Sequence, residues 1–454
     1  MLVSLEQLEK RIKDGSVDTV IVAFPGLYGR LLGKRFDAEF FLSTVADRGT
    51  HGCNYLATVD MEMEPVEGYA FANWDAGYGD FHMQPRIESL RVLSWADRTA
   101  IILCDIVEEQ THDLVPHLPR SILQNQVHRA NEQCFSAKAA TELEYYLFQE
   151  SYEQAQKQNY ENLNPSGWYL EDYHILQGSR RERFHGELRR QLKASGIPVE
   201  STKGEWGLGQ HELNVVYGDI VEMADRHILI KQCAKELADQ LGVSVTFMAK
   251  QSQDQAGSSC HIHLSLWEGK KNAFDGEEQF GRIKCSSTFQ HFLAGWISHA
   301  SEFMPFYAPT VNSYKRYQHG SWAPTTLAWS QDNRTAGFRV VGSDSSLRIE
   351  CRIPGADCNP YLALAASLAS GLDGVAQQMI PPEEFVGNAY DEEGPAVVPT
   401  TFTEAIQAFE RSVFVKETLG EDVHQHYVHF YRTEQIAYEK SVTDWERQRY
   451  FERI

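Results

Sequence analysis

Four segments of this chain look like β-strands, yet each carries ionisable side chains on one face. Side chains two residues apart on a strand point to the same face, and the buried face of a strand in a large domain is normally apolar. Burying charge is costly unless the charge is paired or bound to a metal. The segments are 141–148 (TELEYYLF), 204–213 (GEWGLGQHEL), 257–266 (GSSCHIHLSL) and 347–353 (LRIECRI).

Either these polar faces lie in water, or they converge on one cavity. Solvated edge strands, a surface hairpin at 204–213 and a cross-strand ladder of salt bridges at 347–353 would produce the same alternation. If the strands share a sheet, the cavity holds at least five glutamates and a histidine on one side and several arginines on the other. Hard divalent cations prefer carboxylate oxygens, and arginine forks fit phosphate and carboxylate. That combination is typical of phosphoryl transfer.

Composition narrows the class of protein further. The chain has 454 residues, of which 42% are hydrophobic, so it can bury a sizeable core. A formal net charge of −21 argues against a nucleic-acid partner, which needs a basic face. The eight cysteines form no C-x-x-C pair and are expected to be reduced thiols. No signal peptide or long apolar run is visible, so we expect a cytoplasmic protein without a membrane partner.

The order of the predicted elements indicates an α+β chain with two parts, residues 1–105 and 106–454. In the first part we expect a helix opened by Ser4 at 4–14 and strands at 19–24, 53–58 and 100–106. In the second part we expect helices at 121–132, 225–241 and 359–369, strands at 137–148, 243–248 and 261–267, and loops at 149–181 and 381–399.

The charged segments, taken together and in order, resemble those of the glutamine synthetase superfamily. Further matching motifs are N-S-Y-K-R (312–316), A-P (323–324), N-R-T-A-G-F-R (333–339) and R-I-E-C-R-I-P-G-A-D-C-N-P-Y-L (348–362). In the first part, G-R-L-L-G-K (29–34), G-D-F-H-M-Q-P (79–85) and C-D-I (104–106) also fit. The resemblance covers nearly the whole chain.

The resemblance implies a small N-terminal β-grasp domain and a larger catalytic domain with a curved antiparallel sheet flanked by helices. It also implies homo-oligomers, usually stacked hexameric rings that form a dodecamer, with sites between subunits. The implied ligands are ATP, glutamate and two or three Mg²⁺ or Mn²⁺ ions per site.

Site residues follow from the resemblance by position. The first metal would be bound by Glu144, Glu205 and Glu212, and the second by Glu142, His261 and Glu350. Glutamate would be held by Arg316 beside Gly257. Phosphate would be contacted by Arg334 and Arg339, and the transferred phosphoryl and acyl groups by Arg352. The nucleotide side would include Glu200, His263, Ser265 and Arg348.

Three departures from the family pattern bear on the substrate. Where ammonia-using members carry a glutamate two residues before A-P, the segment here is H-G-S-W-A-P, with Trp322 just before Ala323. Tryptophan cannot accept a proton from ammonium, but its face suits the carbon skeleton of an amine or a cation. The family's D-G-S-S segment is absent; Asp60 in 58–66 is the nearest aspartate and the candidate base. An Asn-Gly pair that helps to hold glutamate appears as Ala256-Gly257.

These departures are similar to the γ-glutamylpolyamine and γ-glutamylalkylamide synthetase branch. We therefore expect a ligase that joins glutamate to an organic amine, a polyamine or an alkylamine, through γ-glutamyl phosphate. The alternatives are an ammonia-using glutamine synthetase, a non-catalytic structural or regulatory homologue, and a guanidino kinase with a related sheet. The motif N-S-Y-K-R counts against the last of these.

Overall fold

The computed structural model describes residues 1–391 and 396–454, and these contain a six-stranded sheet, a ten-stranded sheet and a small hairpin. The first sheet contains β1 (Thr19–Pro25), β2 (Leu31–Asp37), β3 (Thr50–Cys53), β4 (Asp80–Pro85), β5 (Arg91–Val92) and β6 (Thr99–Val107). The second contains β7 (Ser136–Phe148), β8 (Val199–Gly204), β9 (Gln210–Val215), β10 (Gly218–Asp219), β11 (Ser244–Thr246), β12 (Cys260–Glu268), β13 (Lys271–Asn272), β16 (Trp329–Gln331), β17 (Phe338–Val341) and β18 (Arg348–Cys351). The hairpin is β14 (Glu278–Phe280) and β15 (Ile283–Cys285).

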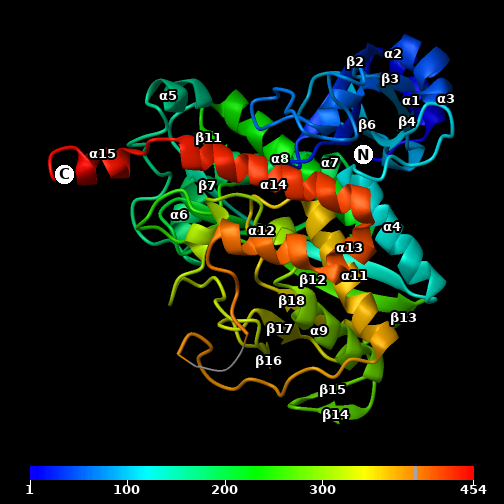
Figure 1. The fold of residues 1–454 in the computed structure, drawn as a ribbon. Helices are drawn as coiled ribbons and strands as arrows, with labels where there is room; N and C mark the ends of the chain where they lie inside the picture. Colours follow the sequence, from blue (N-terminus) through cyan, green and yellow to red (C-terminus); the bar gives the residue numbers. More distant parts are fainter. Residues whose placement is uncertain (392–395) are drawn as a thin grey trace.

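Helices pack against both sheets, and Figure 1 shows the first sheet at one end of the molecule and the C-terminal helix projecting on the opposite side. The helices are α1 (Leu5–Lys13), α2 (Ala38–Phe40), α3 (Ala46–Arg48), α4 (Pro119–Glu132), α5 (Tyr152–Lys157), α6 (Ile175–Arg180), α7 (Glu182–Ala194), α8 (Ile220–Leu241), α9 (Ser287–His299), α10 (Met304–Tyr307), α11 (Pro360–Gln377), α12 (Phe402–Arg411), α13 (Val413–Leu419), α14 (Glu421–Lys440) and α15 (Asp444–Tyr450).

The N-terminal sheet is built as expected at its start and differs at β3. Ser4 caps α1 by accepting a hydrogen bond from the backbone of Gln7, and the Gln7 side chain accepts one from the backbone N–H of Ser4. The predicted strand at 53–58 is wrong, because β3 ends at Cys53 and a 3₁₀ turn follows. Thr58 closes that turn with its backbone and hydroxyl bonds to the Tyr55 carbonyl. The polar side chains here favour a turn over an extended strand.

The second sheet places the four charged segments on neighbouring strands. Its strand order is β16-β17-β18-β12-β7-β9-β8, and the pairs from β17 to β8 are antiparallel. The register sets Glu142 opposite His261 and Glu144 opposite Glu212. On the other side of β12, the residue opposite His263 is Glu350. The polar faces therefore adjoin one another, which the alternation alone could not establish.

Helices cover the opposite face of this sheet with their buried apolar side chains. Helices α4 and α8 pack against β7, and α11 packs against α4, α8 and α9. The expected Gly242 ends α8 in a left-handed conformation, with φ of 70°. Helix α11 opens with Asn359-Pro360 as predicted but continues to Gln377. The predicted loop 149–181 contains α5 and α6, whereas the predicted loop 381–399 has no helix or strand among its described residues.

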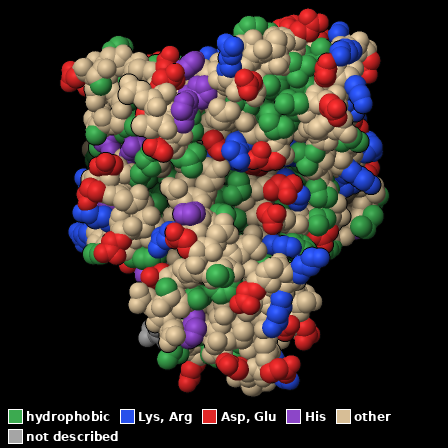
Figure 2. Space-filling model, turned by 90° about the vertical axis from the view of Figure 1, so that its right-hand side faces the viewer, with side chains coloured by type: hydrophobic (Ala, Val, Ile, Leu, Met, Phe, Trp, Pro, Cys, Tyr) green, Lys and Arg blue, Asp and Glu red, His purple; other side chains and the backbone are tan. Residues whose placement is uncertain are grey.

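The surface and the thiols agree with the composition. Acidic and basic side chains are interspersed over the face in Figure 2 rather than gathered in one basic patch. All eight cysteines are free. Within the described ranges, no helix is long and apolar enough to span a bilayer.

Buried histidines give the fold a pH dependence. Burial holds the pKa values of His185, His227 and His426 well below the ordinary value. Below about pH 6.5 the unfolded chain binds protons at these histidines and the folded chain does not, so the free energy of unfolding falls as pH falls. We expect a lower urea midpoint at pH 5.5 than at pH 7.5. A midpoint that is unchanged or higher at pH 5.5 would contradict this assignment.

Candidate active site

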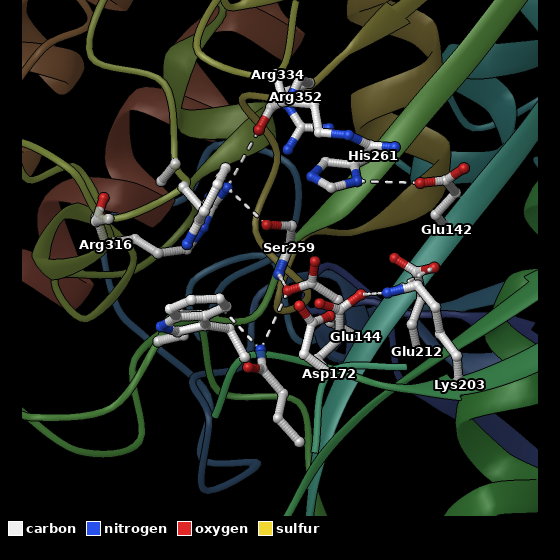
Figure 3. Close-up of a pocket in the computed structure, with 18 of the residues that line it drawn as sticks. Glu142, Glu144, Asp172, Lys203, Glu212, Ser259, His261, Arg316, Arg334 and Arg352 are labelled. Carbon is white, nitrogen blue, oxygen red and sulfur yellow. Dashed lines mark hydrogen bonds and ion pairs between the residues drawn. The ribbon is translucent and has the colours of Figure 1, made fainter. Parts of the chain in front are cut away.

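A cavity of about 450 Å³ opens over the polar face of the second sheet. Figure 3 shows carboxylates from β7 and β9 on one side of it and arginines from later segments on the other. Predicted site residues that line it are Glu142, Glu144, Glu205, Glu212, Gly257, His261, Arg316, Trp322, Arg334, Arg339 and Arg352. The structure thus brings these residues from separate segments together around one cavity.

Three carboxylates form the first candidate metal centre. One oxygen from each of Glu144, Glu205 and Glu212 lies within 4.8 Å of the others. Burial and the neighbouring Glu205 raise the pKa of Glu144 to about 7, and burial with Glu205 and Glu142 raises the pKa of Glu212 well above its ordinary value. Three neighbouring carboxylates repel one another when they are buried and ionised, and a bound cation would relieve this repulsion. Carboxylate oxygens are suitable ligands for Mg²⁺ or Mn²⁺. The donor set fits a divalent ion.

A second cluster surrounds His261. Its Nδ1 lies 3.2 Å from Glu142 and 3.7 Å from Glu350. Glu142 also pairs at 3.0 Å with His263, which lies on the same face of β12. Burial and nearby Arg352 lower the pKa of His261 to about 4, so the ring is neutral and keeps a lone pair for a metal. Its Nε2 is buried without a hydrogen-bond partner among the described residues. Donor atoms close enough to share a metal ion come from two overlapping groups here, Glu142 with His261 and Glu212, and Glu142 with His263 and Glu350.

Two arginines compensate the charge of Glu350, which is fully buried. Arg339 and Arg352 approach its two oxygens at 2.8 Å and 2.6 Å. Burial alone would raise the pKa of Glu350, but Arg352 and His263 lower it to about 2. Arg334 lies at the exposed rim of the same cavity (Figure 3). This positive side faces the carboxylate clusters, as a phosphate-binding cavity requires.

Arg316 reaches the cavity through a space that only glycine leaves open. A Cβ at Gly257 would lie 2.1 Å from the Arg316 side chain. The guanidinium donates to the carbonyl of Ile353 at 2.8 Å and to the hydroxyl of Ser259 at 3.1 Å. Its Nε is buried and has no partner in the described part of the chain. Arg316 is thus held rigidly, with a donor still available.

The nucleotide-side residues lie apart from this cavity. Arg348 donates to His263 at 3.2 Å, and neither residue lines the cavity. Ser265 follows on the same face of β12 and accepts a hydrogen bond from Trp267. Glu200 lines a second cavity of about 500 Å³, which shares Lys203 with the first. The roles of these residues stay predictions.

Asp60 is not brought to the cavity by its own chain. Its carboxylate accepts backbone hydrogen bonds from Glu62 at 3.0 Å and Glu64 at 2.9 Å, in the connection between β3 and β4. The described residues that line the cavity come instead from the second sheet and its loops. Asp60 therefore does not line the cavity in the described part of this chain, and its role as the base stays a prediction. A role in the reaction would require a second copy of the protein.

The structure adds residues that sequence reasoning missed. Lys203 places its ammonium between Glu205 and Glu212, 3.7 Å from the latter. Asp172 lines the cavity, and its backbone donates to the Glu205 carbonyl at 3.2 Å. The ring of Trp206 lies 5.8 Å from that of Trp322. Lys203 and Glu205 are two residues apart, and this spacing could have indicated that Lys203 lies beside the carboxylates. Asp172 lies in a long connection whose sequence shows no such pattern.

Comparison with known proteins gives consistent matches. Residues 117–450 match the family model described as glutamine synthetase, catalytic domain. Gamma-glutamylethanolamide synthetase GlnA4 of Streptomyces coelicolor is 44% identical over 99% of this chain and 96% of its own. Glutamate–isopropylamine ligase of a Pseudomonas species is 34% identical over 98% of this chain and 97% of its own. A solved structure described as a GmaS/ADP complex aligns with a TM-score of 0.85 and 27% identity, over 99% of this chain and all of that one.

Proposed function

This chain belongs to the glutamine synthetase family, and from that premise we propose that it is an ATP-dependent ligase that forms a γ-glutamyl amide from glutamate and a small organic amine. The observation that carries the proposal is the cavity in which two ligand clusters face Arg316, Arg339 and Arg352. Its relatives named for ethanolamine and isopropylamine support an organic amine as acceptor.

The metal centres would use the two clusters already described. Mg²⁺ or Mn²⁺ held there would neutralise negative charge on the phosphate groups. We assign Glu144, Glu205 and Glu212 to one ion and Glu142, His261 and Glu350 to the other. Lys203 supplies a further positive charge beside the first cluster.

The reaction has two chemical steps. An oxygen of the glutamate γ-carboxylate attacks the γ-phosphorus of ATP, the bond to ADP breaks, and γ-glutamyl phosphate forms. Arg339 and Arg352 stabilise the negative charge on the transferred group, and Arg316 binds the α-carboxylate. The amine nitrogen then attacks the acyl carbon, and phosphate leaves with the oxygen that came from glutamate.

The amine must lose a proton before it attacks, because alkylamines are mostly protonated at pH 7. We infer that Asp172 accepts this proton. It is the aspartate that lines the cavity, and Trp206 and Trp322 line the same cavity. The indole faces would contact the carbon chain of the amine and attract its ammonium form before deprotonation.

The direct test is a screen of about twenty amines with ATP, glutamate and Mg²⁺, read by phosphate release and by mass spectrometry of the amide. We expect short alkylamines and hydroxyalkylamines to be used in preference to ammonium. Preference for ammonium would favour the ammonia-using alternative, and preference for polyamines would place the chain in the polyamine branch. Failure to bind ATP would favour a non-catalytic homologue.

Trp322→Glu is expected to shift the acceptor preference. A carboxylate in place of the indole removes apolar contact and attracts ammonium, so the ratio of kcat/KM for the preferred amine to that for ammonium should fall about tenfold or more. Trp445→Glu, at an exposed tryptophan of α15, is the matched control and should leave the ratio unchanged. An unaltered ratio in Trp322→Glu would show that Trp322 does not contact the acceptor.

We further propose that the chain forms a ring-shaped homo-oligomer in the cytoplasm, with a two-domain division at residues 105 and 106. In such an assembly Asp60 would belong to a site shared with a neighbouring copy. Light scattering after size-exclusion chromatography distinguishes a dodecamer from smaller assemblies, and a monomer that retains full activity would exclude any role for Asp60.

A further inference from the structure

The N-terminal sheet carries a group of metal-ligand side chains that the ligase reaction does not use. One ligand atom from each of His51, His82 and Glu109 lies within 4.8 Å of the others. We propose that these three residues bind a divalent transition-metal ion, with Zn²⁺ as the expected occupant.

The sheet itself sets this arrangement. His51 on β3 and His82 on β4 are directly opposite each other in the antiparallel register. On the other side of β4, His82 pairs with Val107, and Glu109 follows two residues after that end of β6. Directly opposite side chains on paired strands lie on one face. Three adjacent strands thus bring the ligands to one place.

The distances between the ligand atoms suit a tetrahedrally coordinated zinc ion. Glu109 Oε2 lies 2.9 Å from His51 Nε2 and 3.8 Å from His82 Nδ1. Ligand atoms at about 2.1 Å from zinc in a tetrahedron are about 3.4 Å apart, and the two observed distances lie on either side of that value. An ion fits with small side-chain rotations.

His82 is already oriented as a ligand. Its Nε2 lies 3.3 Å from the amide oxygen of Gln84, which accepts a hydrogen bond from the Nε2–H group, so the Nδ1 lone pair faces Glu109. A Cβ at position 49 would lie 2.3 Å from the His82 ring, so Gly49, with φ of 66°, lets the backbone pack against the imidazole. The ring is buried, with 6% of its residue surface exposed.

The remaining ligands are accessible and not occupied by other charges. The side chains of His51 and Glu109 are about half exposed. Within residues 1–391 and 396–454, the ion pairs of Glu109 are those with the two histidines. Lys34, a nearby cation, donates to the backbone carbonyl of His51 rather than to Glu109. The ring centre of His112 lies 5.8 Å from that of His82, outside the three-residue group.

The ligand chemistry separates this site from the active site. Two imidazoles and one carboxylate favour zinc and neighbouring transition metals, whereas Mg²⁺ prefers oxygen ligands. An ion here would join β3, β4 and the end of β6. Because it binds only the folded sheet, it should raise the melting temperature.

The test is calorimetric titration of the metal-free full chain with Zn²⁺ in the presence of excess Mg²⁺. The wild type should show a Zn²⁺ site whose affinity falls at least tenfold in both Glu109→Gln and His51→Ala. Both substitutions are at half-exposed positions, so folding should be retained and checked by circular dichroism. Zn²⁺ should also raise the melting temperature of the wild type more than that of either variant.

The matched control is His128→Ala. His128 on α4 pairs with Glu132 at 3.3 Å and is exposed, but it has no third ligand in the described chain. This variant should bind Zn²⁺ as the wild type does. The proposal would be overturned if Glu109→Gln and His51→Ala bound Zn²⁺ with the same affinity as the wild type. The three residues would then form only histidine–carboxylate ion pairs.

Discussion

Replacing Glu350 with glutamine is expected to reduce kcat about a thousandfold, a loss typical for removal of one preorganised electrostatic group. Glu350 is fully buried and is contacted by Arg339 at 2.8 Å and Arg352 at 2.6 Å. The amide keeps the shape of the side chain but carries no charge for the second metal ion. The measurements are ADP release in the presence of amine and the number of Mn²⁺ ions bound per chain, which should fall by one.

The same substitution also tests how much the buried ion pairs of Glu350 contribute to the free energy of unfolding. Removing one partner of a buried ion pair leaves the other uncompensated, which costs about 3–5 kcal/mol of unfolding free energy. Glu150→Gln is the matched control, because Glu150 is buried and hydrogen-bonded to Asn164 but does not line the cavity. Glu350→Gln with wild-type turnover and a folded circular-dichroism spectrum would show that Glu350 is not a metal ligand.

Asp172→Asn is expected to lower kcat/KM for the amine about a hundredfold, because a positioned general base contributes roughly 10²–10⁴ in rate. The KM values for glutamate and ATP should change little, since the lost group acts on the amine. Activity should recover partly as pH rises toward the pKa of the free amine, because more unprotonated amine is then present. The informative measurement is the pH profile of kcat/KM for the amine.

The control for Asp172→Asn is Asp254→Asn, because Asp254 is an aspartate that does not line the cavity. Asn214→Asp would not serve as a control, because Asn214 lines the cavity and donates a hydrogen bond to Glu212. The Asp254→Asn variant should retain the wild-type profile. A profile for Asp172→Asn that runs parallel to that of the wild type, with a small loss at every pH, would exclude Asp172 as the base. The base would then have to come from another residue, with Asp60 of a second copy as the remaining prediction.

The sequence pattern could predict which ionisable side chains share a strand face, because strand alternation is a local property. Glu142 and Glu144 had to share a face of β7, as did His261 and His263 on β12. What alternation could not give was the strand order. That order is set by long-range pairing, and it decides that Glu350 lies opposite His263 rather than on a distant edge.

Other residues escaped prediction for equally physical reasons. Asp172 enters the cavity from a connection without periodicity, and its position depends on a backbone contact with Glu205. Trp206 lies in the turn between β8 and β9. An aromatic residue in a turn does not by itself indicate which way its side chain points, so its position in the cavity could not be predicted. The extension of α11 past Ala369 reflects packing of its apolar surface against α9, which propensity does not report.

The most direct test of the central claim is isotopic. Glutamate labelled with ¹⁸O in its γ-carboxylate is incubated with the enzyme, ATP, Mg²⁺ and the preferred amine, and the inorganic phosphate is analysed by mass spectrometry. If the cavity phosphorylates the γ-carboxylate, one ¹⁸O appears in phosphate for each amide formed. Phosphate without ¹⁸O, or label in AMP instead, would contradict the mechanism.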